Sequence, residues 1–125
     1  MYTYRAKVVR VIDGDTVVLD IDLGFDIHHV KSCRLYGINA YELRDKDPVK
    51  RGLANDGKNY LTSILVGDVT IESKELDKYG RPLVIIWDNP SDTRSVNQRM
   101  VQNGLAVSYL DPKNKLGNTE PDTAQ

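Results

Sequence analysis

The sequence predicts a small β-barrel with helices, an α+β domain whose elements follow the order β-β-β-α-β-β-α. Three observations lead to this prediction: alternating strand patterns in the first third of the chain, one amphipathic helical stretch in the middle, and further strands after it. Five strands with a helix between the third and the fourth have the topology of the OB-fold, a five-stranded Greek-key barrel. That fold often binds oligonucleotides or oligosaccharides, which suggests a substrate class but no reaction.

Three strands are expected first. The first begins near Tyr4, where apolar and basic residues alternate, and Asp13-Gly14 then predicts a hairpin turn because glycine tolerates a positive φ. In the second, over residues 17–23, every other residue is apolar, which is the pattern of a half-buried strand. The third covers about residues 27–38. Short turns between them predict an antiparallel meander.

The middle and the end of the chain supply the helices and the last strands. Residues 39–50 read as a polar loop, and apolar residues then recur at helical spacing over residues 50–66, although Gly57 lowers the helix propensity there. Two more strands are expected around residues 69–72 and 83–87. Ser95 with Gln98 three residues later is a capping box, which predicts the start of a short second helix.

Length and composition favour one domain over residues 1–110, with a polar tail, residues 111–125, that we expect to be disordered. No apolar run is long enough to span a membrane, and the first residues do not read as a signal peptide, so a cytoplasmic protein is expected. The sole cysteine, Cys33, excludes an internal disulfide and reads as a small buried hydrophobe. For the oligomeric state, a monomer is the default expectation.

The net charge is −1, but the signs are segregated. Three basic residues precede Asp13 with no acid among them, and acidic residues then follow without a base as far as Asp22. A metal-dependent phosphodiesterase needs an acidic pocket beside basic groups, and this pattern is compatible with one. The neighbouring His28 and His29 suggest a metal site less, because adjacent strand residues point to opposite faces.

Four charged residues are candidates for chemistry. Asp15 follows the predicted turn, Arg34 lies in an apolar strand, Glu42 follows that strand, and Arg81 follows another turn. Each one alone also fits an ordinary turn or surface role. Together they offer a cation ligand, a proton acceptor and two phosphate donors, which are the groups that phosphodiester cleavage requires. Arginine suits the last task because its planar fork binds two phosphate oxygens.

Several segments together resemble the staphylococcal (micrococcal) nuclease family, also called thermonuclease-like. They appear in the family's order and cover roughly residues 4–110. The matching segments are Val11 to Val17, Arg34 through Glu42, Asp77-Lys78-Tyr79-Gly80-Arg81, and Val96-Asn97 through Ala106. Each is weak alone, but their order and the matching topology make the resemblance strong.

The resemblance implies a calcium-dependent endonuclease with an OB-fold that acts on DNA and possibly RNA and releases products ending in 3′-phosphate. By the same resemblance, Asp15 and the carbonyl of Ala40 are calcium ligands, Arg34 and Arg81 bind phosphate, and Glu42 acts as general base. Tyr79 and Tyr109 then line the nucleotide site, and Asp13 and Thr16 support Asp15 from either side.

One position departs from the family's pattern. This chain has Asn39 where the family usually has a second ligand aspartate, so the site loses one negative charge, although an amide oxygen can still bind calcium. Tyr41 also replaces a proline of the family's pattern, and no clear counterpart of the family's third helix follows. Two other functions stay open: a nucleic-acid-binding module without catalysis, and a protein-binding OB domain.

Overall fold

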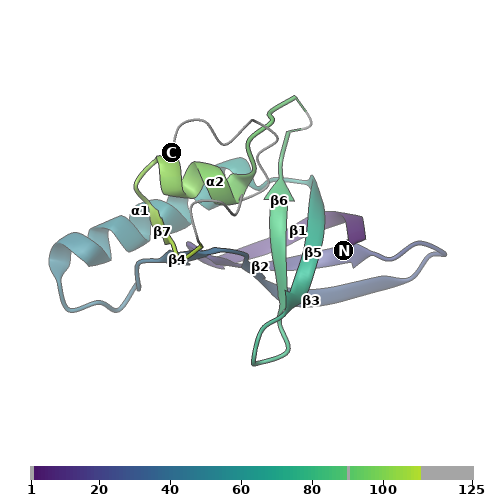
Figure 1. The fold of residues 1–125 in the computed structure, drawn as a ribbon, viewed down its shortest axis with the longest axis horizontal. Helices are drawn as coiled ribbons and strands as arrows, with labels where there is room; N and C mark the ends of the chain where they lie inside the picture. The colour runs from purple at the N-terminus through teal and green to yellow at the C-terminus, as the bar shows by residue number, and fades with distance from the viewer. Residues whose placement is uncertain (1, 90, 111–125) are drawn as a thin grey trace.

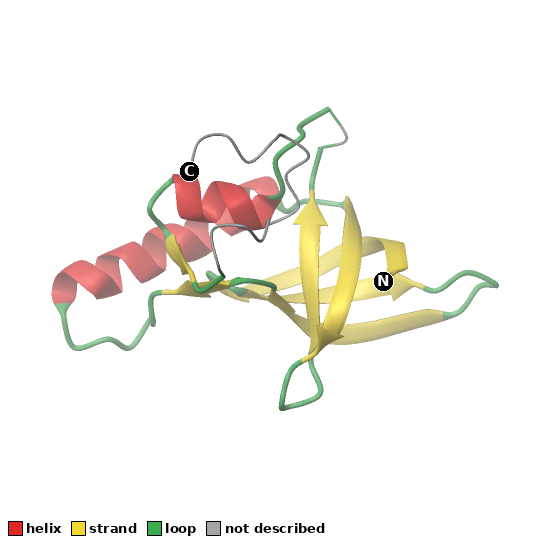
Figure 2. Cartoon of the chain, viewed as in Figure 1, coloured by secondary structure: helices red, strands yellow, loops and turns green. Residues whose placement is uncertain are grey.

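The structure is a computed structural model, which describes residues 2–89 and 91–110; the predicted tail lies outside these ranges. Five strands form a closed barrel in the order β1-β2-β3-β6-β5 (Figures 1 and 2). Their bounds are β1 Tyr2–Asp13, β2 Thr16–Asp22, β3 His28–Leu35, β5 Asp68–Leu76 and β6 Pro82–Trp87. The predicted five-stranded barrel and its order of strands and helices are therefore confirmed.

The pairing of the strands follows from short turns and one crossover. β1, β2 and β3 form the predicted antiparallel meander, and β5 pairs antiparallel with both β6 and β1. The barrel closes through a short parallel pairing in which Arg34 faces Leu83 and Leu35 faces Val84. Because this closure occurs at the end of β3, Arg34 lies where three strands meet.

The core lies inside the barrel and under the helices. Val17, Leu19 and Ile21 of β2 point inward and are buried, as their alternation predicts. Leu61, on helix α1 (Pro48–Ile64), joins the same core and is fully buried. α1 begins two residues earlier than predicted because the Asp47 side chain accepts a hydrogen bond from the Val49 N–H at 3.0 Å and Pro48 suits the first turn.

Helix α2 (Val96–Gln102) begins where the capping box predicts. The Ser95 hydroxyl accepts a hydrogen bond from the Gln98 N–H at 3.0 Å, and Val96 and Met100 are fully buried. Figure 1 shows that both helices lie on the same side of the molecule, away from the β2–β3 hairpin. No helix within residues 2–89 and 91–110 is both long and apolar enough to cross a lipid bilayer.

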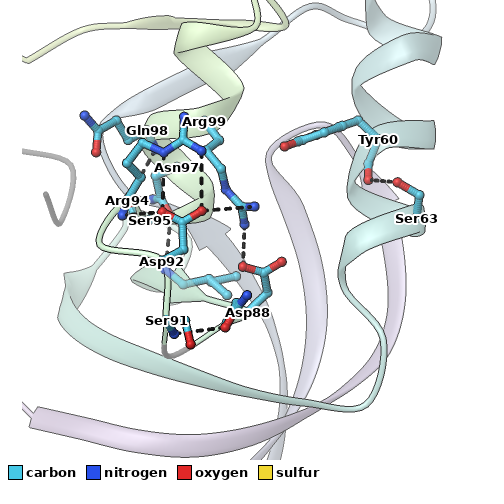
Figure 3. A network of polar contacts seen from close by, with 12 residues as sticks. Tyr60, Ser63, Asp88, Ser91, Asp92, Arg94, Ser95, Asn97, Gln98 and Arg99 are labelled. Carbon is cyan, nitrogen blue, oxygen red and sulfur yellow. Dashed lines mark hydrogen bonds and ion pairs between the residues drawn. The ribbon is translucent and has the colours of Figure 1, made fainter.

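An ion-pair network joins Asp88, just after β6, to residues at the start of α2 and before it (Figure 3). Arg99 of α2 pairs with Asp88 and lies 3.8 Å from the Asp92 carboxylate, and Arg94 pairs with Asp92 at 3.3 Å. Two acids and two arginines balance one another here. The network therefore links α2 to the end of β6.

The predicted loop over residues 39–50 is wrong at its beginning. Gly37 has a φ of 82°, so the chain turns sharply after β3 and starts a new strand, β4 (Ile38–Ala40). β4 pairs antiparallel with β7 (Ala106–Ser108) in a two-stranded sheet outside the barrel. Three-residue strands are too short for an alternating pattern to reveal them. Asn39 and Ala40 therefore lie on a paired strand and not in a loop.

The prediction that Gly14 adopts a positive φ in the β1–β2 turn is also wrong. Gly14 is not among the glycines with positive φ. A Cβ at Gly14 would instead lie 2.7 Å from the Ala40 Cβ, which is closer than two carbon atoms can approach. The Gly14 Cα also lies 3.8 Å from the position of a Cβ on Gly57 of α1. Gly14 thus lets the turn and β4 pack closely together, whereas a Cβ on Gly57 would make only ordinary van der Waals contacts.

Candidate active site

A polar pocket of about 270 Å³ lies at the end of the barrel where β2 begins and β3 ends. Thr16 is directly opposite Arg34 in the β2–β3 pairing, so the β1–β2 turn brings its carboxylates beside this arginine. β4 and the segment after it supply a second wall, and the β5–β6 turn supplies Arg81. The lining residues are Asp13, Asp15, Thr16, Arg34, Asn39, Ala40, Tyr41, Glu42 and Arg81.

Asp15 is the most enclosed acid of the pocket, with 8% of its surface exposed. Its Oδ2 accepts a hydrogen bond from the Ala40 N–H at 2.9 Å, and its Oδ1 accepts one from the Thr16 hydroxyl at 3.1 Å. Burial raises the pKa of Asp15, and the Asp13 side chain raises it further, while the Ala40 N–H and the Arg34 charge oppose the rise. The site thus holds two close carboxylates whose repulsion a bound cation would relieve.

Arg34 lies across the pocket from the β1–β2 turn and is largely covered. Its Nη2 is 3.4 Å from Asp15 Oδ2, donates to the Ile38 carbonyl at 3.3 Å, and also donates to Asn39 Oδ1. On β3 it alternates with the buried Cys33 and Leu35, so its side chain points away from the barrel core and into the pocket. Burial raises the pKa of the Cys33 thiol to about 11, so Cys33 stays a neutral core residue.

Arg81 is positioned by Asp77 at the other end of the β5–β6 turn. The Arg81 Nε donates to Asp77 Oδ2 at 2.7 Å and its backbone N–H donates to Oδ1 at 2.8 Å. Desolvation acts to raise the pKa of Asp77, but the hydrogen bonds from Arg81 and Tyr79 outweigh it and lower that pKa. Asp77 therefore stays ionised and fixes the Arg81 side chain at the rim of the pocket.

Glu42 lines the pocket and is exposed to solvent. Within the described part of the chain, its carboxylate makes no hydrogen bond or ion pair. A carboxylate that is not already engaged can accept a proton from a water molecule, provided that the water lies within hydrogen-bonding reach.

The two predicted tyrosines lie outside the group of lining residues. Tyr79 is 71% exposed, and its ring centre is 5.5 Å from the Arg81 guanidinium carbon. Tyr109 is half exposed, and its hydroxyl accepts a hydrogen bond from the Gly37 N–H at 3.1 Å. Both lie on segments next to the pocket, and their role with nucleotides stays a prediction.

Asn97 supports the site, although its residue type alone does not reveal this role. It is fully buried, its Oδ1 accepts from the Ile86 N–H at 3.1 Å, and its Nδ2 donates to the carbonyls of Tyr36 and Val84 at 2.9 and 3.0 Å. It thereby joins α2 to β6 and to the chain just after Arg34. A polar residue in the first turn of a helix gives no local sign of such distant partners. In the sequence, Asn97 belongs only to the Val96-Asn97 segment that carries the family resemblance.

The side-chain oxygens that could bind a metal here belong to the buried Asp15 carboxylate, the Asn39 amide, and the carboxylates of Asp13 and Glu42. A hard cation such as calcium prefers oxygen ligands of this kind. Among the residues that the structure describes, no three His, Cys, Asp or Glu side chains form a ready metal cluster. The chemical type of these oxygens therefore fits calcium, but they are not gathered into a ready-made cluster of charged ligands.

The closed barrel, the pocket at its β1–β2 turn, and the two arginines that line this pocket, Arg34 and Arg81, together match the fold and site expected for the staphylococcal nuclease class. The chain matches the family model described as staphylococcal nuclease homologue over residues 32–124, and it belongs to this family.

Three relatives illustrate the similarity. The chain is 36% identical to Protein ParB of Escherichia coli over 111 residues, which cover 84% of the chain and 57% of that protein. It is 30% identical to the thermonuclease of Staphylococcus hyicus over 104 residues (80% and 56%), and 32% identical to that of Staphylococcus intermedius over 111 residues (86% and 61%). The chain thus spans somewhat more than half the length of these relatives.

Proposed function

We propose that this chain is a calcium-dependent nuclease that hydrolyses phosphodiester bonds of DNA, with RNA as a second substrate, to products with 3′-phosphate ends. The observation that carries the proposal is the pocket itself. It combines the buried Asp15 with Arg34, Arg81 and an unengaged Glu42, which are the groups that such hydrolysis needs. Family membership and two thermonuclease relatives support it.

The proposed roles rest on the family resemblance and are supported by the position of these residues in the pocket. Asp15, the Asn39 amide oxygen and the Ala40 carbonyl would hold calcium, which supplies positive charge and orients water when bound. Arg34 and Arg81 donate to the phosphate oxygens as negative charge develops there. Glu42 accepts a proton from the water whose oxygen attacks phosphorus. The bond from phosphorus to the 5′ oxygen breaks, and that oxygen takes a proton from solvent water and leaves as the 5′ hydroxyl.

Cleavage of single-stranded DNA tests the proposal. We expect wild-type protein to cut it with millimolar calcium and to stop when a chelator is added. Glu42→Gln keeps the size of the side chain but removes the proton acceptor, so cleavage should fall by a factor of about 10² or more. Glu75→Gln, a change at an exposed glutamate of β5 that does not line the pocket, is the matched control and should cut like the wild type. Unchanged cleavage by Glu42→Gln, or none by the wild type, contradicts the proposal.

A second candidate function, nucleic-acid binding without hydrolysis, is favoured by Asn39, which replaces a charged ligand by a neutral one. Asn39→Asp separates the two. If the pocket holds calcium through residue 39, this variant should bind calcium more tightly and cut faster. Oligonucleotide binding in chelator with no cleavage by either protein would favour the binding module.

A further inference from the structure

One strand of the barrel keeps an open edge. β3 pairs with β2 from His28 to Arg34, but on its other side it pairs with β6 only at Arg34 and Leu35. Residues 28–31 come before that second pairing and are all exposed to solvent, on the hairpin that extends away from the helices (Figure 1). Within residues 2–89 and 91–110, this half of β3 therefore has a neighbouring strand on one side only.

Two hydrogen bonds show which backbone groups point to this edge. The Leu35 N–H donates to the Asp15 carbonyl on the β2 side at 2.8 Å, and the Tyr36 N–H donates to the Val84 carbonyl on the β6 side at 2.8 Å. Successive residues of a strand turn their N–H and C=O groups to opposite edges. The odd-numbered residues of β3 therefore face β2, and the even-numbered residues face the open edge.

The open edge of β3 contrasts with the edge of β6 that α2 covers. There, Asn97 Oδ1 accepts from the Ile86 N–H at 3.1 Å and its Nδ2 donates to the Val84 carbonyl at 3.0 Å, so a side chain takes the place of a further strand. At β3, the N–H and C=O groups of His28 and Val30 have no hydrogen-bond partner among the described residues. The fold thus closes one edge and leaves the other available for pairing.

The side chains beside the open edge differ between its two faces. His29 and Lys31 share one face, and both are exposed. Val30 lies on the other face and is 59% exposed. Asp20 of β2 is on the same face as Val30 but is already engaged, since its Oδ1 lies 3.0 Å from His28 Nδ1. A strand added here would meet the positive charge of Lys31 on one face and an apolar side chain on the other.

A second copy of this chain fits the edge poorly. Antiparallel pairing of two copies about Val30 would place Lys31 of each copy opposite His29 of the other, with no acid between them. Basic side chains directly opposite each other destabilise a strand pair, and a lysine on an edge strand protects against self-association. An acidic side chain in the same position would be attracted to Lys31 instead.

We propose that β3 binds an extended segment of another protein as an added strand, through the N–H and C=O groups of His28 and Val30. This segment has acidic side chains at the positions beside His29 and Lys31, and β-branched apolar side chains at the alternate positions beside Val30. Backbone hydrogen bonds supply the affinity, and the alternation of side chains supplies the selectivity. The surface is independent of the chemistry proposed for the pocket.

An NMR titration of isotope-labelled protein tests the proposal. The probe is a peptide of about eight residues with blocked ends in which valine and glutamate alternate, and the control peptide has lysine in place of glutamate. The amide signals of His28 and Val30 should shift and exchange more slowly with solvent, because their N–H groups gain partners. Those of His29 and Lys31, whose N–H groups face β2, should shift less. The lysine peptide should bind about fivefold more weakly.

Two outcomes of this titration would overturn the proposal. One is the absence of any shift at millimolar peptide. The other is a set of equal shifts at odd and even positions of β3, which strand addition does not produce.

Two variants locate the interaction. Val30→Pro removes an N–H that faces the open edge, and proline is tolerated on edge strands, so the affinity for the glutamate peptide should fall about tenfold. Lys31→Glu should weaken binding of the glutamate peptide about fivefold and strengthen binding of the lysine peptide. Lys50→Glu makes the same charge change on an exposed position of α1 and should leave both affinities unchanged. Equal effects of Lys31→Glu and Lys50→Glu would contradict the assignment.

The wild-type titration and Lys31→Glu decide the question even if Val30→Pro fails to fold. Sedimentation of the wild type alone tests the other protein occupant, because dimerisation through the same amides would assign the edge to a second copy. A single-stranded oligonucleotide that shifts these amides in chelator would assign it to nucleic acid, and either result overturns the proposal. None of these measurements uses cleavage, so their failure is distinguishable from failure of the proposed function.

Discussion

The two ends of β2 are both hairpin turns, yet they differ in almost every respect. At its start, Gly14 is enclosed by Ala40, α1 and Met100, and the turn carries the buried Asp15. At its end, Gly24 has no neighbour within 4 Å of an added Cβ, and Phe25 is 98% exposed on a hairpin that extends away from the helices (Figure 1).

The difference shows that a turn can require a glycine for either of two separate physical reasons. Gly14 is required by the space around it, since its φ is not positive. Gly24 is required by its own backbone, with a φ of 82° and open space around it. The candidate site lies at the end where distant segments pack against the turn, and the opposite end has only its local geometry to maintain.

The largest effect is expected for Gly14→Ala. The new Cβ would lie 2.7 Å from the Ala40 Cβ, so the turn or β4 must shift, and we expect a loss of about 3 kcal/mol in the free energy of unfolding. Urea denaturation measures it. Gly52→Ala, on the exposed side of α1 with nothing within 4 Å, is the matched control and should raise stability by up to about 1 kcal/mol. Equal effects of the two changes would refute the packing explanation.

A smaller loss, about 1 kcal/mol, is expected for Gly24→Ala, because an L residue is strained at its φ of 82° although nothing obstructs its side chain. Calcium affinity and cleavage should stay at wild-type values, in contrast to Gly14→Ala, which displaces Ala40 and should weaken both. Parallel denaturation and cleavage assays of the two variants check this. A loss of cleavage in Gly24→Ala would show that the two ends of β2 are coupled.

A gain is expected from Phe25→Gly. Phe25 has a φ of 56° and is almost wholly exposed, so it is strained without compensating contacts. Glycine removes the strain but adds entropy to the unfolded chain, and a net rise of about 0.5 kcal/mol in stability should remain. Thermal denaturation measures it. A clear loss of stability would mean that the Phe25 ring makes contacts in solution.

The smallest effect concerns the β5–β6 turn, which combines a positive φ at Gly80 with a link to the pocket through Asp77 and Arg81. The folded state lowers the pKa of Asp77 below its usual 3.8. Its contribution to stability is therefore complete above pH 3.8 and is lost as the pH falls through the folded-state pKa. The stability difference between wild type and Asp77→Asn should shrink in that acid range. A difference that stays constant there would exclude this linkage.

The barrel could be predicted from the sequence because its information is local. Alternation over β1 to β3, the helical spacing of α1 and the cap at Ser95 each depend on neighbouring residues. β4 and β7 could not be predicted in this way. Each has three residues, and Ile38 pairs with Ser108 at the far end of the described chain, so that their pairing depends on the finished fold.

The charged residues of the candidate site could be predicted from the sequence, but the contacts that support them could not. The topology and the family resemblance together bring Asp15, Arg34, Glu42 and Arg81 to one pocket, as the structure shows. The supporting contacts could not be foreseen from the sequence. Asn97 bonds to backbone groups far away in the chain, and the spacing role of Gly14 exists because Ala40 lies against it.

The β4–β7 pair ties the second wall of the pocket to the core. Asn39 and Ala40 lie on a strand whose ladder belongs to this small sheet and not to the barrel, while Asp15 belongs to the barrel turn. The sheet is nevertheless anchored, because Ile38 of β4 and Ala106 of β7 are both buried in the hydrophobic core. The hydrogen bond from the Ala40 N–H to Asp15 joins the two walls, so a change in the packing of β4 reaches the buried carboxylate directly.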